Sequence, residues 1–244
     1  MTSTEAKLYQ LKQLKGKPLK QQLEHIITYF WLPILLSLAL LVGAVAYIVH
    51  LVNMKDLGLA VICLNARTNS EATTEFLEDF VQYASIDTDT YEISLEDRLF
   101  LSDELSSDAY QANQVIMVQG SAGDLDVVAG DMTFVQSYFY WDIFGDLREQ
   151  LTAQQQEKYA DYFLYMDMAV LREMESSLDA SPEQPDPTKP ELMAEPVPVA
   201  LLIPQGSRLL EAYYSDVTAP ICLGILGNSE NMERVLSFLD YIME

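Results

Sequence analysis

The sequence predicts an α/β protein, with a single N-terminal transmembrane helix followed by one mainly parallel, three-layer α/β domain. Two observations indicate this fold class. An apolar run at residues 31–52 is long enough to cross a bilayer as a helix, which takes about 20 residues. After it, apolar runs alternate with segments of helical periodicity, as in a parallel sheet covered on both faces. We therefore divide the 244 residues into a basic tail (1–28), a transmembrane helix (29–53) and an outer domain (54–244).

Charge is distributed unevenly around the apolar run. Residues 1–30 hold five lysines against Glu5 and Glu24, a net charge of +3, and the remainder holds nine basic and 35 acidic residues, a net charge of −26. The positive-inside rule therefore predicts a single-pass cell-membrane protein with a cytoplasmic N-terminus and an extracytoplasmic domain. The alternative is a cleaved signal peptide, because residues 44–46 (AVA) resemble a cleavage site. The apolar run continues past them to Val52, which favours an uncleaved anchor.

The first half of the outer domain alternates strands with helices. The continuous apolar run 57–66 is typical of a buried strand, and 91–95 alternates as a short strand does. In 70–84 the apolar residues recur at helical spacing. Strands are predicted at 57–66, 91–95 and 125–130, and helices at 70–84, 103–119 and 131–141.

The second half continues this alternation after a helix at 151–163, which opens with Thr152 and Gln155 at capping-box spacing. Strands are predicted at 196–204 and 219–227, and helices at 207–214 and 229–243. The stretch 181–198 holds six of the ten prolines, which excludes a regular helix and predicts an exposed loop.

The stretch GSAGDLDVVAGD (120–131) is rich in glycine and aspartate but matches no ligand loop. A phosphate loop needs a lysine at the start of a helix, and these glycines precede a strand. Of the acidic positions of a calcium loop, only Asp124 and Asp126 are filled. We expect a helix that stops at Gly120, then a turn and a buried strand.

Two segments resemble extracellular solute-binding proteins of ABC importers, which have the type II periplasmic-binding fold. The first combines a small-Gly-x-x-Asp-Val-Val segment, an aromatic-rich helix and an Asp-Leu pair. The second combines a late strand, an Asn-Ser turn and a helix with a Phe-Leu pair. The matching residues are Ala122, Gly123, Asp126, Val127, Val128, Phe134 to Trp141, Asp146, Leu147, Asn228, Ser229, Phe238 and Leu239. They cover about a third of the outer domain, roughly 120–152 and 219–243.

The sequence also departs from that family. Its members are considerably longer and close two lobes on a ligand, whereas 191 residues follow residue 53 here. The resemblance therefore implies one lobe, with the other lost or reduced. A membrane span also stands where such proteins have a lipid-linked cysteine.

Five residues are candidates for ligand binding. In open α/β sheets, ligands sit beyond the carboxyl ends of the strands. Asn65, Asp131 and Gln205 are expected near such ends. Tyr138 and Trp141 belong to a run of four aromatic residues that offers a stacking face for a sugar, although core packing also explains most of that run.

The residue types that are missing exclude several kinds of chemistry. His25 and His50 both lie at or before the end of the apolar run, so the outer domain has no histidine. This excludes Ser-His-Asp and Cys-His catalysis and ordinary catalytic zinc sites. Carboxylate pairs, as in glycosidases, remain an alternative, but none stands out. We predict no catalytic residues, no metal and no cofactor, and a charge of −26 argues against nucleic acid.

The leading hypothesis is a membrane-anchored, non-enzymatic outer domain related to solute-binding proteins, which binds a small solute such as a sugar or assists an ABC importer. The alternative is a protein-interaction module that has kept the fold without ligand binding. A polar cleft lined by the candidate residues favours the first, and a filled cleft with an exposed apolar patch favours the second. Cys63 and Cys222 are expected to be buried free thiols, although their strands are candidates for neighbours.

Overall fold

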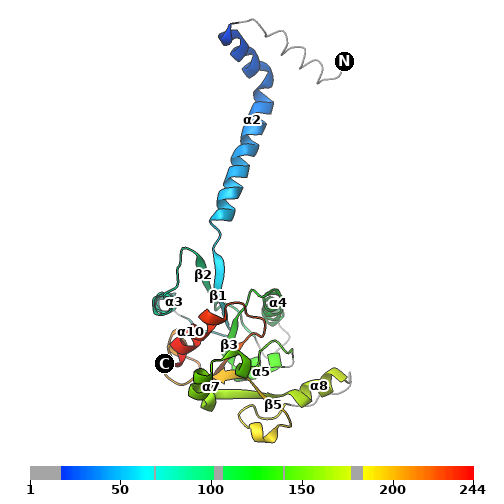
Figure 1. Cartoon of the computed structure of the whole chain (residues 1–244), viewed down its shortest axis with the longest axis vertical. Helices are drawn as coiled ribbons and strands as arrows, with labels where there is room; N and C mark the ends of the chain where they lie inside the picture. Colours follow the sequence, from blue (N-terminus) through cyan, green and yellow to red (C-terminus); the bar gives the residue numbers. More distant parts are fainter. Residues whose placement is uncertain (1–17, 69, 102–106, 140, 177–183) are drawn as a thin grey trace. The chain divides into compact units, whose positions relative to one another are not determined.

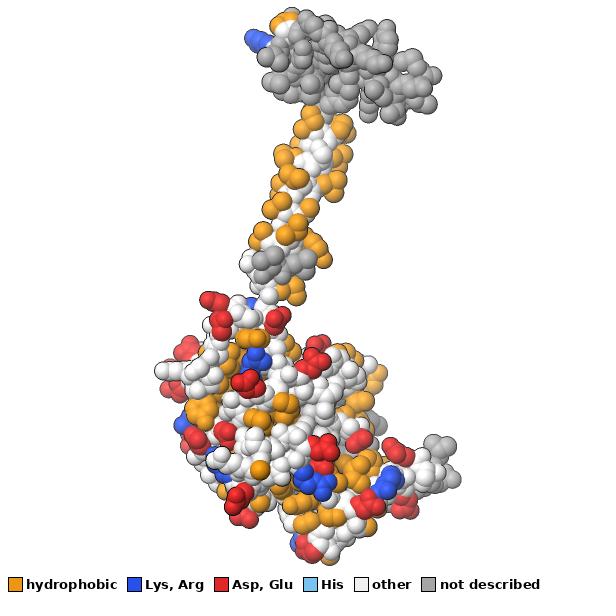
Figure 2. All heavy atoms as spheres, viewed as in Figure 1, with side chains coloured by type: hydrophobic (Ala, Val, Ile, Leu, Met, Phe, Trp, Pro, Cys, Tyr) orange, Lys and Arg blue, Asp and Glu red, His pale blue; other side chains and the backbone are white. Residues whose placement is uncertain are grey.

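The computed structural model divides the chain into two units, and the first contains one long apolar helix. The structure describes residues 18–68, 70–101, 107–139, 141–176 and 184–244. Helix α2 runs from Leu19 to Val52 (Figure 1). Its 19-residue segment Trp31–Val49 has a mean hydropathy of 2.5 and is long and apolar enough to cross a membrane. Apolar side chains follow one another along the helix in Figure 2. Residues 1–17 of the predicted basic tail lie outside the described residues.

The second unit, Lys55–Glu244, is built on a six-stranded sheet with the order β2-β1-β3-β6-β5-β4. Its strands are β1 (Asp56–Cys63), β2 (Tyr91–Glu96), β3 (Val127–Asp131), β4 (Phe163–Asp167), β5 (Pro196–Leu202) and β6 (Ile221–Ile225). Strand β1 pairs in parallel with β2 and β3. The pairs β3–β6, β6–β5 and β5–β4 are antiparallel. The sheet is therefore mixed, and the prediction of a mainly parallel sheet is wrong.

The short connection between β5 and β6 explains the direction of β6. Helix α9 (Arg208–Tyr213) has six residues and rises only about 9 Å. Strand β5 has seven residues and extends about 23 Å. Because α9 does not carry the chain back along the sheet, β6 begins at the edge where β5 ends and runs antiparallel to it.

Helices cover both faces of the sheet, so the three-layer α/β architecture is confirmed. On one face lie α3 (Ser70–Tyr83), α6 (Leu147–Gln150), α7 (Ala153–Tyr159), α9 and α10 (Met232–Met243). On the other lie α4 (Ser107–Ala122), α5 (Met132–Phe139) and α8 (Met168–Ser176). Figure 1 shows α3 and α10 on one side of β1 and α4 on the other. The pleat of the strands divides the core, since Leu59 and Val61 pack on the first face and Ala60 and Ile62 on the second.

The remaining described segments are short. Two 3₁₀ turns cover Ala160–Tyr162 and Pro190–Leu192. The capping box of Thr152 and Gln155 is present at the start of α7, as predicted. Of the predicted proline-rich loop, residues 181–183 lie outside the described residues, and 184–195 contain neither a strand nor an α-helix. Strand β5 then begins at Pro196.

The glycine-rich stretch 120–131 is a helix end, a turn and a buried strand, as predicted. The position of the helix end differs, because α4 continues to Ala122. Gly123 follows with a φ of +79°, the left-handed conformation in which helices commonly end on glycine. Gly120 lies inside the last turn, where an added Cβ would stand 3.0 Å from a methyl carbon of Leu226. Close packing, and not chain reversal, is therefore the role of Gly120.

Asp126, the residue before β3, is fully buried. Its carboxylate accepts hydrogen bonds from the Ala60 backbone N–H at 2.8 Å and from the Ser229 hydroxyl at 2.6 Å. The Asn231 amide donates to it at 3.2 Å. Asp124, the other candidate for a calcium loop, is exposed. The Asp126 carboxylate thus joins β1, β3 and the turn before α10.

The two cysteines are buried free thiols, as predicted. Their strands are not neighbours, because Cys63 is paired with Ala129 of β3 and Cys222 with Gly130 on the other side of β3. Two strand spacings place them roughly 10 Å apart, and a disulfide needs Cα atoms closer than about 7 Å. Cys63 also faces the α3 layer, whereas Cys222 faces the α4 layer.

We expect both thiols to resist alkylation in the folded protein. Burial raises the pKa of Cys63 to about 12 and also raises the pKa of Cys222 above its ordinary value. The reactive thiolate is therefore scarce at pH 8 and shielded where it forms. Iodoacetamide treatment followed by mass spectrometry should label neither cysteine in the native protein and both in denaturant. Rapid labelling of the native protein, or a linked peptide pair without reductant, would contradict this.

Candidate functional site

Strands β1, β2, β3 and β5 all end at one edge of the sheet. β5 points the same way as β3, because each is antiparallel to β6, which lies between them. Asn65 follows β1, Asp131 ends β3 and Gln205 follows β5. The fold therefore brings these three candidate residues to the same edge, where ligands bind in many open α/β sheets.

The polar side chains at this edge already have partners within the domain. Asn65 has a φ of 55°, and its Oδ1 accepts a hydrogen bond of 2.7 Å from the Leu101 backbone N–H. Asp131 Oδ1 accepts one of 2.8 Å from the Thr133 N–H at the start of α5. The Asn65 side chain thus holds a loop that lies 36 residues further along the chain, and the Asp131 side chain closes a local backbone turn. Gln205 is exposed.

The two aromatic candidates lie at the end of α5. Tyr138 is buried, and its hydroxyl donates a hydrogen bond of 2.8 Å to Asn113 Oδ1 of α4. Burial raises its pKa well above the ordinary value. Trp141 is 40% exposed and meets the Tyr138 ring edge to face, with 5.0 Å between the ring centres. Tyr138 is therefore a core residue, and Trp141 presents an aromatic surface next to α4.

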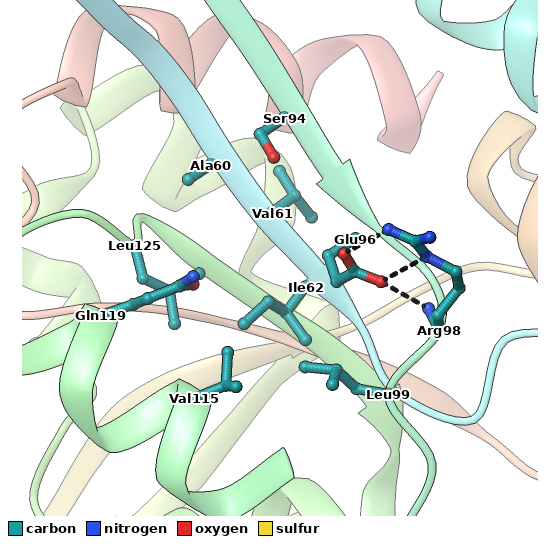
Figure 3. Close-up of a pocket in the computed structure, with 10 residues that line it drawn as sticks. All are labelled: Ala60, Val61, Ile62, Ser94, Glu96, Arg98, Leu99, Val115, Gln119 and Leu125. Carbon is teal, nitrogen blue, oxygen red and sulfur yellow. Dashed lines mark hydrogen bonds and ion pairs between the residues drawn. The ribbon is translucent and has the colours of Figure 1, made fainter. Parts of the chain in front are cut away.

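A groove of about 450 Å³ lies elsewhere, between α4 and the edge strand β2 (Figure 3). Its floor is apolar and comes from β1, α4 and the two adjoining loops. Ser94, Glu96, Arg98 and Gln119 add polar groups. The apolar lining residues are Ala60, Val61, Ile62, Leu99, Val115 and Leu125. Its volume falls within the range of about 300–1,000 Å³ of small-molecule sites.

The alternation of β2 explains why this groove stays open. Ile93 and Leu95 pack on the α3 side of the sheet. Ser94 and Glu96 therefore lie on the α4 side of β2, the outermost strand. Polar residues at alternate positions of a strand indicate an uncovered face, and this is the signal in the sequence from which the groove could have been predicted.

Glu96 and Arg98 form an ion pair on the rim of the groove, at 3.2 Å between Oε1 and Nε. Partial burial acts to raise the pKa of Glu96, but hydrogen bonds and the charge of Arg98 outweigh it and hold the pKa below its ordinary value. Glu96 therefore stays ionised at neutral pH and is a poor general acid. The lining combines hydrogen-bonding groups with apolar contact surface.

A second cavity, of about 400 Å³, lies between α7 and α10. Its central group is Asp240, which accepts hydrogen bonds from the Tyr159 hydroxyl at 2.5 Å and the Gln155 amide at 2.9 Å. Lys158 Nζ stands 3.6 Å from the same carboxylate. These contacts fix α7 against α10. None of the five predicted ligand residues lines either cavity.

The described side chains on the outer side of α4 are exposed and uncharged. Tyr110 is 65% exposed, Val118 67% and Met117 40%. The Gln114 amide donates to the Tyr110 hydroxyl at 3.0 Å, which places it on the same side of the helix. Trp141 packs on Tyr138, whose hydroxyl donates a hydrogen bond to Asn113 of α4. We call Tyr110, Gln114, Met117, Val118 and Trp141 the α4 face.

Comparison of the chain with protein-family models, with curated proteins and with solved structures finds no match.

Proposed function

We propose that this chain is a single-pass membrane protein whose acidic outer domain is a non-enzymatic protein-interaction module. The helix Trp31–Val49 would serve as the anchor. The lysines before it support a cytoplasmic N-terminus and an extracytoplasmic domain.

One observation favours an interaction module over a solute-binding domain. Three of the five residues expected to bind a solute, Asn65, Asp131 and Tyr138, form hydrogen bonds within the domain itself. In contrast, the α4 face leaves Tyr110 and Val118 about two-thirds exposed. Exposed aromatic and aliphatic side chains gathered on one surface are typical of protein contact sites.

Descent from a solute-binding protein remains compatible with this function. The outer domain forms one unit with one sheet, which is consistent with a single lobe. A lobe that has lost its partner leaves a ligand with one side in water, and small-molecule sites usually bury at least about 70% of the ligand surface. The groove beside β2 is the best remaining place for a small solute.

We therefore expect the full-length chain in lipid nanodiscs to bind sugars, amino acids and short peptides no more tightly than about 1 mM, or roughly 4 kcal/mol. Calorimetric titration against a panel of such solutes measures this. A ligand with a micromolar dissociation constant, whose binding is lost in Glu96→Gln or Trp141→Ala, would restore the solute-binding hypothesis. The exposed substitution Gln82→Glu, on α3, is the control.

A further inference from the structure

The five residues of the α4 face are uncharged, although the domain is strongly acidic and the exposed Asp142 directly follows Trp141. No charged residue lies between Asp108 and Asp124, and none lies between Asp131 and Asp142. These two segments contain all five residues of the α4 face. Elsewhere acidic side chains are spread over the domain, as Figure 2 shows for one side.

This charge distribution disfavours a basic partner on the α4 face. A basic protein would gain most by docking where carboxylates are dense, and it would gain no electrostatic advantage on the α4 face. Another acidic protein would be repelled least if it docked on this same face. A second copy of this chain is such an acidic protein, because its residues 31–244 hold nine basic and 35 acidic residues.

We propose that two copies of the chain pair through their α4 faces, about a twofold axis. The proposal rests on the function proposed above and names the partner. In a twofold interface the same patch is used on both copies, so that Met117 and Val118 of one copy would pack on the α4 face of the other. The membrane anchor assists, because confinement to one bilayer raises the effective concentration of copies and allows a small contact to persist.

Cysteine cross-linking in native membranes tests this pairing on the full-length chain. Gln114→Cys, Val118→Cys and Ser121→Cys each place a thiol on the exposed side of α4. Gln82→Cys is the matched control, because it is exposed on α3 on the opposite face of the sheet. After mild oxidation we expect a disulfide-linked dimer from at least one α4 position and none from Gln82→Cys. The native cysteines are buried and give no background.

Substitutions that add a charge to the α4 face provide a second test of the dimer. Met117→Glu and Val118→Glu each place a carboxylate on both sides of the twofold contact, and we expect either to abolish most of the dimer formed by Gln114→Cys. Gln82→Glu, which adds the same charge on α3, should leave it unchanged. Raising the salt concentration should increase dimer formation, because screening weakens the repulsion between acidic domains. Resistance of each variant to limited proteolysis verifies its fold.

The outcomes separate this proposal from the proposed function. No dimer from any α4 position, or equal dimer from Gln82→Cys, would overturn the pairing of copies. If a photo-crosslinker at Met117 then captured a different protein, the interaction module would stand without self-association. If it captured nothing, both proposals would fail.

Discussion

Replacing Asp126 by alanine is expected to lower the free energy of unfolding of the outer domain by about 3 kcal/mol or more. The substitution leaves the buried Ala60 N–H without an acceptor, and each such buried group costs about 1–3 kcal/mol. It also releases the Ser229 hydroxyl and the Asn231 amide, which hold the turn before α10. Urea unfolding of residues 55–244 measures the change, with Trp141 as the one tryptophan in that fragment.

Asp124→Ala is the matched control for this prediction. Asp124 is exposed and lies only two positions earlier, so we expect its replacement to change stability by less than about 0.5 kcal/mol. Equal effects of the two substitutions would show that Asp126 does not stabilise the sheet as described.

Gly224→Ala is expected to cost about 3 kcal/mol, the upper part of the usual range for overpacking a core. Gly224 lies in β6, and an added Cβ would stand 2.3 Å from Cε1 of the Phe144 ring. That ring is buried and packs against Phe139, with 5.9 Å between the ring centres, so it has little freedom to move. The same unfolding measurement applies.

A double-mutant cycle identifies the cause of this loss. Phe144→Leu should be destabilising alone, but together with Gly224→Ala it should cost less than the sum of the two changes, because the smaller side chain relieves the clash. Gly227→Ala is the control, since its added Cβ would make an ordinary contact of 3.6 Å with Gly145. Additive losses would exclude the proposed clash.

Local signals in the sequence located most of the strands but not their directions. The apolar runs at 57–66 and 219–227 stand out because both faces of β1 and β6 are buried. The direction of β6 depends instead on how far α9 carries the chain, which no periodicity records. Strand β4 was missed because it follows the 3₁₀ turn Ala160–Tyr162 without a break and extends the end of a predicted helix.

For the candidate site, the sequence likewise indicated contacts between neighbouring residues but not contacts between distant ones. The edge position of Asn65 followed from the strand before it, but its hydrogen-bond partner, Leu101, lies 36 residues away and depends on the folded loop. Asp131 bonds a backbone N–H only two residues ahead, a local turn typical of aspartate that the sequence does suggest. The sequence also did not show which side of α4 is exposed. Met117 and Val118 are apolar and resemble core residues until the helix is placed against the sheet.

Photo-crosslinking in living cells tests the central claim, that the outer domain acts through protein contact on the α4 face. A benzoylphenylalanine at Met117 of the full-length chain reports contacts of that face, and one at Gln82 reports contacts of the opposite side. We predict covalent protein adducts from position 117 and none from position 82. The absence of adducts at position 117 in a chain that is expressed and folded, or the same adducts from both positions, would contradict the claim.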